Sequence, residues 1–377
     1  MASPLSALIV VDYPPFVEDF NGATKIQYNV IKRISERCNV DLLIVTSEPC
    51  EVLDVFPNVQ KVYLEVKTPK TPNYFKFFPF PSYSKNFQSQ LIDKYGIDQY
   101  NVVHIYAMSL IGLANLIQPL TILGIDDSFS FSLKRKISLS YCLKYLFWRI
   151  VEIKISKLNA RLTFVSDLDA TQYPTKNKIV LSNGIDTSKY ISRINFHEKI
   201  PNSFVFHGVL DFGPNMDAYH LGEQWITYLG PEWHYYLVGR MTRPQSSLII
   251  DEIANSPTFK YIGSVADVAA EITKYSFYLC LMESGAGIKN KLLEALSCGC
   301  VVFANGKAIE GLVGKTELLP CIFLVETKEQ FKQLVLDTPV EEFKAKAINA
   351  RRYVEKYYSW EKYVESLMEC YQNNLPG

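Results

Sequence analysis

A repeated alternation of short apolar runs and helical segments limits the possible folds of this chain more than any other pattern. Ser6–Val11 (SALIVV) is an apolar run of the length of a buried strand, and Tyr13-Pro14-Pro15 ends it. Ala23–Arg37 follows with apolar residues four positions apart, which predicts a helix with one apolar face. Buried strands that alternate with helices favour a parallel sheet covered by helices on both faces.

The alternation occurs twice along the chain. In the first half we expect strands at Val40–Thr46, Lys61–Val66, Val102–Tyr106, Leu120–Ile125, Arg161–Ser166 and Lys178–Asn183, and helices at Asn86–Tyr95 and Leu133–Leu158. In the second half we expect strands at Ser203–His207, His234–Gly239, Phe259–Gly263, Phe277–Met282, Val301–Asn305 and Ile322–Val325. The helices expected there are Met216–Leu229, Gln245–Ala254, Asp267–Tyr275, Gly287–Leu296, Lys328–Leu336, Val340–Tyr358 and Trp360–Tyr371.

The polar segment Thr187–Asn202 has little periodicity and separates the two halves. The sequence therefore predicts an α/β protein with two Rossmann-like domains, at residues 1–190 and 191–358. Parallel sheets of this kind bind ligands outside the carboxyl ends of their strands. Two such sheets facing each other would form a cleft between the domains, which is a common place for a small-molecule site.

Composition excludes several classes of protein. Lys and Arg number 39 and Asp and Glu also number 39, so no overall basic field is present to attract nucleic acid. The apolar run near the start is far shorter than the ~20 residues that span a bilayer, and no basic segment precedes it, so we expect a cytoplasmic location. The five histidines and eight cysteines show no metal-ligand spacing, so we expect reduced thiols and no metal site.

The most informative segment is a glycine-containing loop, Gly285-Ala286-Gly287, between an expected strand and an expected helix. Backbone N–H groups in such a loop, together with the helix dipole, form an anion site. Lys289 and Lys291 oppose the dipole unless an anion such as a diphosphate lies above them. Glu294 lies on the same helical face and could accept hydrogen bonds from ribose hydroxyls. An ordinary strand-to-helix turn with solvated lysines is the alternative.

This segment resembles a known family. Residues 285–299 (GAGIKNKLLEALSCG), followed by the apolar strand VVFA and by Glu310-Gly311-Leu312, are similar to the nucleotide-sugar motif of glycosyltransferase family 4, the group 1 glycosyltransferases of the GT-B fold. Other segments resemble the family in the same order: Val165–Asp167, Val180–Asp186, His207–Val209, Pro214–Ala218, Leu237–Arg240 and Tyr261–Asp267. The helix Trp360–Tyr371 resembles the one that crosses back to the first domain, so residues 359–377 are expected to belong there.

The resemblance implies a retaining glycosyltransferase that builds a polysaccharide or another glycoconjugate. The second domain would bind a nucleotide-diphosphate sugar, and the first a glycan, lipid-linked or protein-linked acceptor. The family usually needs neither a metal nor a permanently bound cofactor, because a helix dipole and basic side chains stabilise the diphosphate. A nucleotide-sugar epimerase or phosphorylase of the same fold, or a non-catalytic nucleotide-sugar-binding protein, remains an alternative.

The resemblance also implies roles for individual residues. Donor-binding residues would be Gly208, Asn215, Arg240, Gly263, Val265, Gly285, Ala286, Gly287, Ile288, Lys289, Asn290 and Glu294, with Glu294 at the ribose and Gly263 to Val265 at the base. In the first domain, His104 would lie near the reacting sugar, Asp126 would face the acceptor, and the Asn21-Gly22 loop would approach the diphosphate. Together with Glu294, His104 and Asp126 are the catalytic candidates. A core histidine at 104, a strand-end residue at Asp126 and a simple turn at Gly22 are the alternatives.

The sequence departs from the family pattern at two places. Many members carry two glutamates eight positions apart, and the first would fall on Ala286; Glu283 lies three residues earlier and could still reach the donor sugar. The family's Arg and Lys after the first strand of the second domain would fall on Val209 and Pro214. Asn215, Lys289 and Arg240 would then remain to neutralise the diphosphate.

Two stretches combine aromatic and basic residues, Asn73–Lys85 and Leu133–Lys157. Such stretches could place a protein on a membrane surface near a lipid-linked acceptor. Packing within the first domain is the alternative.

Overall fold

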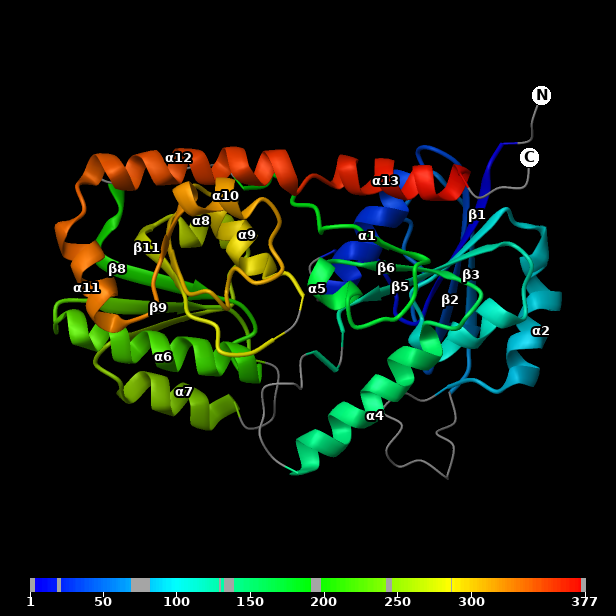
Figure 1. Cartoon of the computed structure of the whole chain (residues 1–377), viewed down its shortest axis with the longest axis horizontal. Helices are drawn as coiled ribbons and strands as arrows, with labels where there is room; N and C mark the ends of the chain where they lie inside the picture. Colours follow the sequence, from blue (N-terminus) through cyan, green and yellow to red (C-terminus); the bar gives the residue numbers. More distant parts are fainter. Residues whose placement is uncertain are drawn as a thin grey trace. The chain divides into compact units, whose positions relative to one another are not determined.

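The structure is a computed structural model that describes residues 4–18, 22–68, 82–128, 130–131, 139–190, 198–241, 246–285 and 287–373. The chain divides into two compact units (Figure 1). The first contains Met1–Gly184 and Trp360–Gly377, and the second is the continuous stretch Ile185–Ser359. Each unit has one parallel sheet with flanking helices, which confirms the predicted α/β fold class.

The sheet of the first unit has the strand order β3-β2-β1-β4-β5-β6-β7, and all neighbours are parallel. Strand β1 (Ser6–Val11) lies between two other strands and places Ile9 between Leu42 of β2 and His104 of β4. The other strands are β2 (Asn39–Thr46), β3 (Val59–Val66), β4 (Val102–Ile105), β5 (Leu120–Asp126), β6 (Arg161–Phe164) and β7 (Lys178–Val180).

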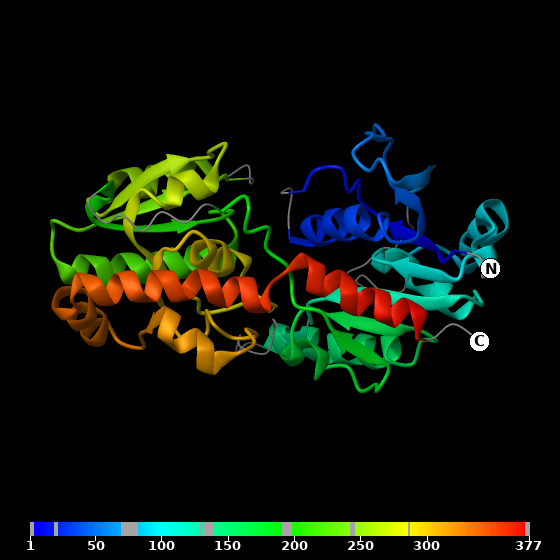
Figure 2. The same ribbon diagram turned by 90° about the horizontal axis from the view of Figure 1, so that it is seen from above.

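Helices cover both faces of this sheet. On one face, α2 (Lys85–Tyr95) and α4 (Leu139–Ile155) bury their apolar residues against the strands. On the other, α1 (Gly22–Ile34) and α13 (Trp360–Gln372) lie side by side (Figures 1 and 2). The remaining helical elements of the unit are the 3-10 helices η1 (Ile97–Gln99) and η2 (Met108–Asn115) and the short α5 (Asp167–Ala170).

The last helix belongs to the first unit because its first residue is buried there. Trp360 packs on the backbone of Gly184 so closely that a Cβ at that glycine would lie 2.4 Å from the indole ring. Arg33 of α1 lies over the same ring, 5.9 Å from its centre, and its Nε is 3.4 Å from a carboxylate oxygen of Glu361. These contacts fix α13 to α1.

The sheet of the second unit has the order β10-β9-β8-β11-β12-β13, again all parallel. Helices α6 and α7 lie along one face, and α8, α9 and α12 along the other (Figure 1). The strands are β8 (Ile200–His207), β9 (His234–Val238), β10 (Phe259–Gly263), β11 (Tyr275–Cys280), β12 (Val301–Ala304) and β13 (Ile322–Leu324). The helical elements are α6 (Gly213–Leu229), α7 (Ser246–Asn255), α8 (Val268–Ile272), α9 (Asn290–Ser297), α10 (Lys315–Leu318), η4 (Leu319–Cys321), α11 (Lys328–Asp337) and α12 (Val340–Tyr357).

Aromatic residues make up 13% of the chain, and many of their side chains fill the core of the second unit. The ring of Phe204 lies 5.0 Å from that of Phe277 and 5.3 Å from that of Phe331, measured between centres. Phe303 stacks on Phe323 at 4.8 Å. Edge and tilted contacts of this kind add to the free energy gained by burying the rings.

Most predicted elements are present, and the differences have local causes. The helix predicted from Gly287 begins at Asn290, because Gly285 (φ 110°) and Gly287 (φ 65°) have left-handed backbone angles that a right-handed helix does not allow. The helix predicted over Asp267–Tyr275 ends at Ile272, and Tyr275 instead starts β11. In the predicted helix Leu133–Leu158, residues 133–138 lie outside the described part of the chain.

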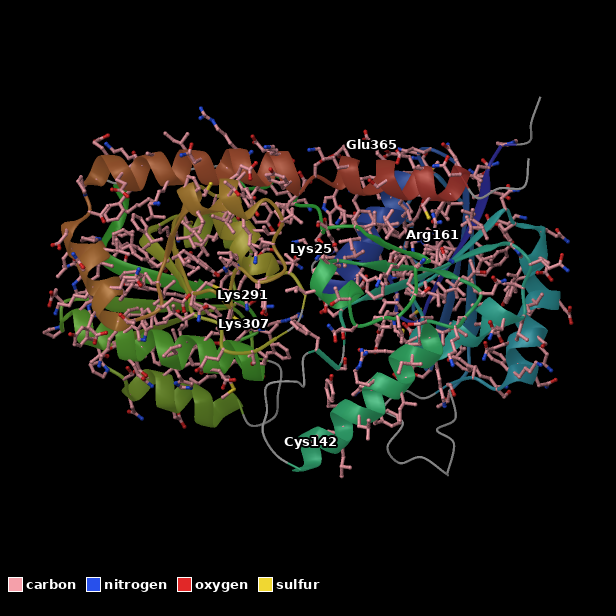
Figure 3. The ribbon with its side chains drawn as sticks, in the orientation of Figure 1. Lys25, Cys142, Arg161, Lys291, Lys307 and Glu365 are labelled. Carbon is pink, nitrogen blue, oxygen red and sulfur yellow. The ribbon has the colours of Figure 1, made fainter. Side chains whose placement is uncertain are left out.

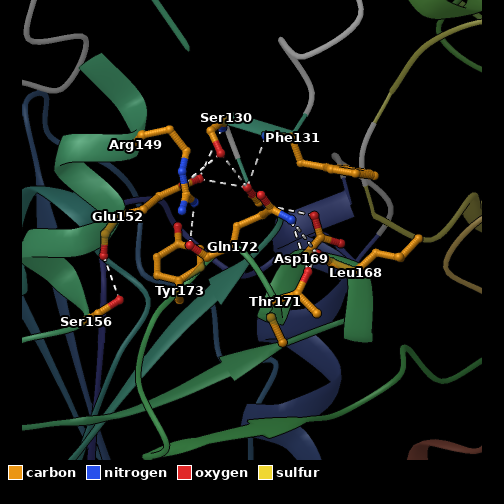
Figure 4. Close-up of polar contacts among 12 residues, drawn as sticks. Ser130, Phe131, Arg149, Glu152, Ser156, Leu168, Asp169, Thr171, Gln172 and Tyr173 are labelled. Carbon is orange, nitrogen blue, oxygen red and sulfur yellow. Dashed lines mark hydrogen bonds and ion pairs between the residues drawn. The ribbon is translucent and has the colours of Figure 1, made fainter. Parts of the chain in front are cut away.

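A buried polar network fixes the segment that follows β5 (Figure 4). Glu152 of α4 is completely buried and accepts hydrogen bonds from the Oγ atoms of Ser128 and Ser130, both at 2.7 Å, and from Nη1 of Arg149 at 2.8 Å. Asp169 accepts from the Ser128 backbone N–H at 2.8 Å. A buried carboxylate needs such partners, so α4 and α5 together determine the path of the chain after Asp126.

Two features are absent from the described residues. Among them, no helix combines the length and the apolar character needed to cross a bilayer. Within the same residues, no three His, Cys, Asp or Glu side chains come together as metal ligands would.

Candidate functional site

The carboxyl edge of the second sheet carries a row of glycines. Gly208, Gly239 and Gly263 lie at the ends of the adjacent strands β8, β9 and β10. The Gly239 N–H donates to the Gly263 carbonyl at 2.8 Å, and a Cβ at Gly239 would lie 1.8 Å from the carbonyl oxygen of Gly208. Without side chains, this edge lets a ligand approach the backbone closely.

A histidine and a glutamate form a pair beside this edge. His207 is the last residue of β8, and its Nε2 lies 2.7 Å from Oε2 of Glu294 on α9. Its Nδ1 lies 3.0 Å from the hydroxyl of Tyr278. Burial raises the pKa of Tyr278 well above its usual value, so the hydroxyl keeps its proton and, when the imidazole is neutral, donates to Nδ1. The Nε2–H then donates to Glu294, which holds the carboxylate in one orientation.

Lys291 brings a positive charge to the same edge from the first turn of α9 (Figure 3). Its Nζ donates to Oδ1 of Asn215 and lies 4.9 Å from the ring centre of Phe206. A Cβ at Gly208 would be 3.7 Å from this Nζ. Burial, with the nearby charge of Lys289, lowers the pKa of Lys291 to about 8, against the opposing effects of Cys280 and Glu294.

Asn215 connects the cation to the loop after β8. Its Nδ2 donates to the backbone carbonyl of Val209 at 2.7 Å, while its Oδ1 accepts from Lys291. The Arg and Lys of the resembled family would fall on Val209 and Pro214, which carry no charge. Lys291 instead supplies one positive charge beside this loop, from helix α9. Lys291, His207 and Tyr278 were not predicted as site residues. His207 had a signal as part of the His207–Val209 motif, and Lys291 had one as a charge in the first turn of the expected helix. Tyr278 had none.

The loop before α9 has a different arrangement from the one expected. Lys289 is buried, and its Nζ donates to the Gly287 carbonyl at 3.1 Å, so the side chain contacts the loop itself. Lys289 is also the N-cap residue of α9 and gives the first turn no side-chain hydrogen bond. The main-chain N–H groups at this end of the helix therefore suit an anion.

The other predicted donor residues are placed as follows. Ile288 is buried, Asn290 and Val265 are half-buried, and Glu283 and Arg240 are exposed. The Arg240 carbonyl accepts from the Leu210 N–H at 2.9 Å, so the loops after β8 and β9 lie together. Ala286 lies outside the described residues.

In the first unit, His104 lies in the interior. It is completely buried, its Nδ1 is 3.0 Å from the Tyr371 hydroxyl, and its ring stacks on Tyr106 at 4.3 Å. Burial lowers its pKa to about 3, so the imidazole is neutral. These contacts fit the alternative of a core histidine. Gly22 is the first residue of α1, and Asn21 lies outside the described residues.

Asp126 ends β5 with a left-handed backbone angle, φ 59°. Burial, with the neighbouring charge of Asp127, raises its pKa to about 7. Asp12, just after β1, has a pKa raised by burial to about 6, and it accepts a hydrogen bond from Ser109 at 3.4 Å. The carboxyl edge of the first sheet thus holds two carboxyl groups that take up protons near neutral pH.

We expect Asp126→Asn to stabilise the protein at alkaline pH. Between about pH 4 and pH 7 the unfolded chain has lost this proton while the folded chain keeps it, so the wild-type free energy of unfolding falls as the pH rises. Because the Asp126 side chain is half-buried, we expect the variant's free energy of unfolding to exceed that of wild type by ~1 kcal/mol at pH 8 and by almost nothing at pH 4. Urea unfolding at both pH values measures this. Asp54→Asn, at an exposed position, is the control. An equal gain at pH 8 in that variant would contradict the raised pKa of Asp126.

Comparison with known proteins gives a family match over the part of the chain that contains this site. Residues 201–337 match the family model "Glycosyl transferases group 1". No curated protein matches the chain. Among solved structures, HepE from Anabaena in complex with UDP is similar at a TM-score of 0.71 and 12% identity, covering 98% of this chain and 100% of that one.

Two further solved structures show the same similarity over nearly whole chains. Sucrose-phosphate synthase from Thermosynechococcus elongatus has a TM-score of 0.72 and 12% identity, with 98% of each chain covered. WaaG, a glycosyltransferase involved in lipopolysaccharide biosynthesis, has a TM-score of 0.62 and 14% identity, with 98% of this chain and 100% of that one covered.

The fold is therefore that of the GT-B glycosyltransferases, as the sequence analysis predicted. The family match lies on the glycine edge, the His207–Glu294 pair and Lys291. Residues 201–337, in the second unit, therefore resemble the group 1 glycosyltransferases, while the similarity in fold extends over the whole chain.

Proposed function

We propose that the protein transfers a sugar from a nucleotide-diphosphate sugar to a glycan or glycoconjugate acceptor, with retention of configuration and without a metal ion. The donor binds to the second unit at the carboxyl edge of its sheet. HepE, which has the same fold, was crystallised with UDP and with UDP-glucose, so a uridine nucleotide is the first donor to test.

The observation that carries this proposal is the pairing of Glu294 with Lys291 on one helical turn beside Gly208. A nucleoside diphosphate has ribose hydroxyls that donate hydrogen bonds. The phosphates on the 5′ carbon of the same ribose carry negative charge. Glu294, held by His207, is an acceptor for the hydroxyls. Lys291 and the N–H groups at the start of α9 supply positive charge for the phosphates.

During transfer, the bond between the anomeric carbon and the diphosphate breaks, and an acceptor hydroxyl oxygen bonds to the same carbon and gives its proton to the leaving phosphate. Negative charge develops on that phosphate as it leaves. Lys291 and the helix N–H groups stabilise that charge in place of a metal ion. Lys289 contributes by holding the Gly287 carbonyl and thus the loop. Asp126 remains our candidate for a group that faces the acceptor.

The proposal is tested by a thermal-shift screen against UDP, GDP, CDP, ADP and dTDP sugars. A nucleotide at 100 times its dissociation constant should raise the free energy of unfolding by ~2.7 kcal/mol. Sugar transfer is then followed with the cognate donor by nuclear magnetic resonance. A donor whose sugar is converted without any acceptor would indicate an epimerase, and binding without turnover a non-catalytic protein. No shift with any nucleotide would contradict the proposal.

Lys291 makes nucleotide binding depend on pH. The free protein loses this charge above pH 8, so we expect affinity to fall as the pH rises from 7 to 9.5. Lys291→Met should weaken binding by ~10–100-fold at pH 7 and flatten the pH profile. Isothermal titration calorimetry with the cognate nucleotide measures both effects. Lys274→Met, which removes an exposed lysine paired with Glu271, is the control; an unchanged profile in Lys291→Met would remove Lys291 from the site.

A further inference from the structure

Helix α4 of the first unit has an apolar outward face. Leu143, Leu146, Ile150 and Ile153 are 60, 58, 47 and 38% exposed. Their spacing of three, four and three residues puts them on one side of the helix, and we call them the α4 stripe. Figure 1 shows the amino-terminal part of α4 extending away from the sheet of its unit, and Cys142, labelled in Figure 3, marks this part.

The opposite side of α4 is the one that packs into the first unit. Trp148, Val151 and Ile155 are buried in its core, and Glu152 is buried in the polar network after β5. A surface helix normally has one apolar side toward the core and a polar side toward water. Because α4 is apolar on two opposite sides, its outward side needs an apolar environment that the described residues do not provide.

The exposed charged residues of α4 and of the turn after it have one sign. Lys144, Lys154 and Lys157 are exposed on α4 and just after it. Glu152 is the one carboxylate in α4, and it is buried and hydrogen-bonded to serines and Arg149. The whole chain has a formal charge of zero, so this positive region is a local feature. Positive side chains beside exposed leucine and isoleucine match the chemistry of an anionic lipid surface.

We propose that α4 docks the first unit on the surface of an anionic phospholipid bilayer. The α4 stripe enters the boundary between headgroups and acyl chains, and the lysines contact lipid phosphates. A stable protein partner typically covers ~800 Å² on each side, more than one row of four aliphatic side chains presents. An interfacial helix needs only such a row with cationic neighbours.

Vesicle binding tests this proposal on the full chain without any nucleotide, so its outcome is independent of donor binding. We expect co-flotation with vesicles of phosphatidylglycerol and phosphatidylcholine in equal amounts, little with phosphatidylcholine alone, and weaker binding at high salt. The double variant Leu146→Ser/Ile150→Ser should bind at least ~10-fold more weakly. Leu336→Ser/Ile348→Ser, which removes two exposed aliphatic residues of the second unit, is the matched control and should bind like wild type.

A fluorophore at Cys142 gives a second measurement, because Cys142 is the exposed cysteine and lies next to the stripe. Its emission should shift to the blue with anionic vesicles in wild type and not in the double variant, whose thermal unfolding should be unchanged. Three results would overturn the proposal: no flotation of wild type, equal binding to neutral vesicles, or a dimer that dissociates in the double variant while vesicles have no effect. The last would make the stripe a protein interface.

Discussion

Replacing Glu294 by alanine is expected to weaken nucleotide binding by ~100-fold and to abolish the thermal shift of the cognate nucleotide. A carboxylate that accepts hydrogen bonds from ribose hydroxyls contributes more than a neutral acceptor, because one partner is charged. Glu294 is partly exposed and held by Nε2 of His207 at 2.7 Å, so it loses little entropy when the ribose binds. Removing it takes away that acceptor and leaves His207 without its partner.

The loss of a structural pair must be separated from the loss of a ligand contact. Tyr278→Phe removes the hydrogen bond to Nδ1 and leaves the carboxylate in place, so we expect less than ~10-fold weaker binding. Glu341→Ala removes a glutamate of the second unit that pairs with Lys344 and should leave binding unchanged. If Glu294→Ala keeps the full thermal shift, the carboxylate does not contact the nucleotide.

The second large effect is expected at Gly239. A methyl group at this position would lie 1.8 Å from the Gly208 carbonyl oxygen, and the backbone angle of Gly239 is φ 140°, which residues with a side chain rarely adopt. Backbone rather than a flexible side chain is in the way, so β8 and β9 must separate at their ends. We expect Gly239→Ala to lower the free energy of unfolding by ~3 kcal/mol or more, and nucleotide binding to be lost.

Gly213 is the matched control for this substitution. It is the first residue of α6, and a Cβ there would meet no atom within 4 Å. Gly213→Ala should therefore be neutral or stabilise the protein by up to ~1 kcal/mol, because alanine loses less backbone entropy on folding. Thermal and urea unfolding of both variants compare the two sites directly. Equal changes in the free energy of unfolding for the two variants would show that the close approach of β8 and β9 does not exclude a side chain at Gly239.

The elements that the sequence predicted best are those set by local patterns. Ser6–Val11 and Phe259–Gly263 are strands with the predicted limits. The first is a short buried apolar run, and the second is a short edge strand with aromatic and β-branched residues that ends at a glycine. The start of α9 was predicted three residues early, because an apolar period does not reveal that Gly285 and Gly287 have left-handed backbone angles. The 3-10 helix η2 was missed because its apolar residues follow neither a helical nor a strand period.

The candidate site was predicted only in part, because residues that are in contact there are far apart in the sequence. Glu294 was found because it lies within the glycine-loop motif, whereas its partner His207 is 87 residues away. Lys291 was noted as a charge in the first turn, but its contact with Asn215 joins the first turns of α9 and α6, which lie on opposite faces of the sheet and meet at its carboxyl edge. His104 shows the converse. Its place near a strand end suggested a ligand contact, and the hydroxyl of Tyr371, 267 residues later, occupies its Nδ1 instead.

The position of α13 has a consequence for the order in which the protein can fold during synthesis. The second unit is one uninterrupted stretch of chain, while the first needs Trp360 and the helix that follows it. A ribosome that has begun the first unit must make the whole of the second before it supplies α13. The unit that is started earlier is therefore the one completed later, and until then the surface of α1 that will receive Trp360 remains open to chaperones.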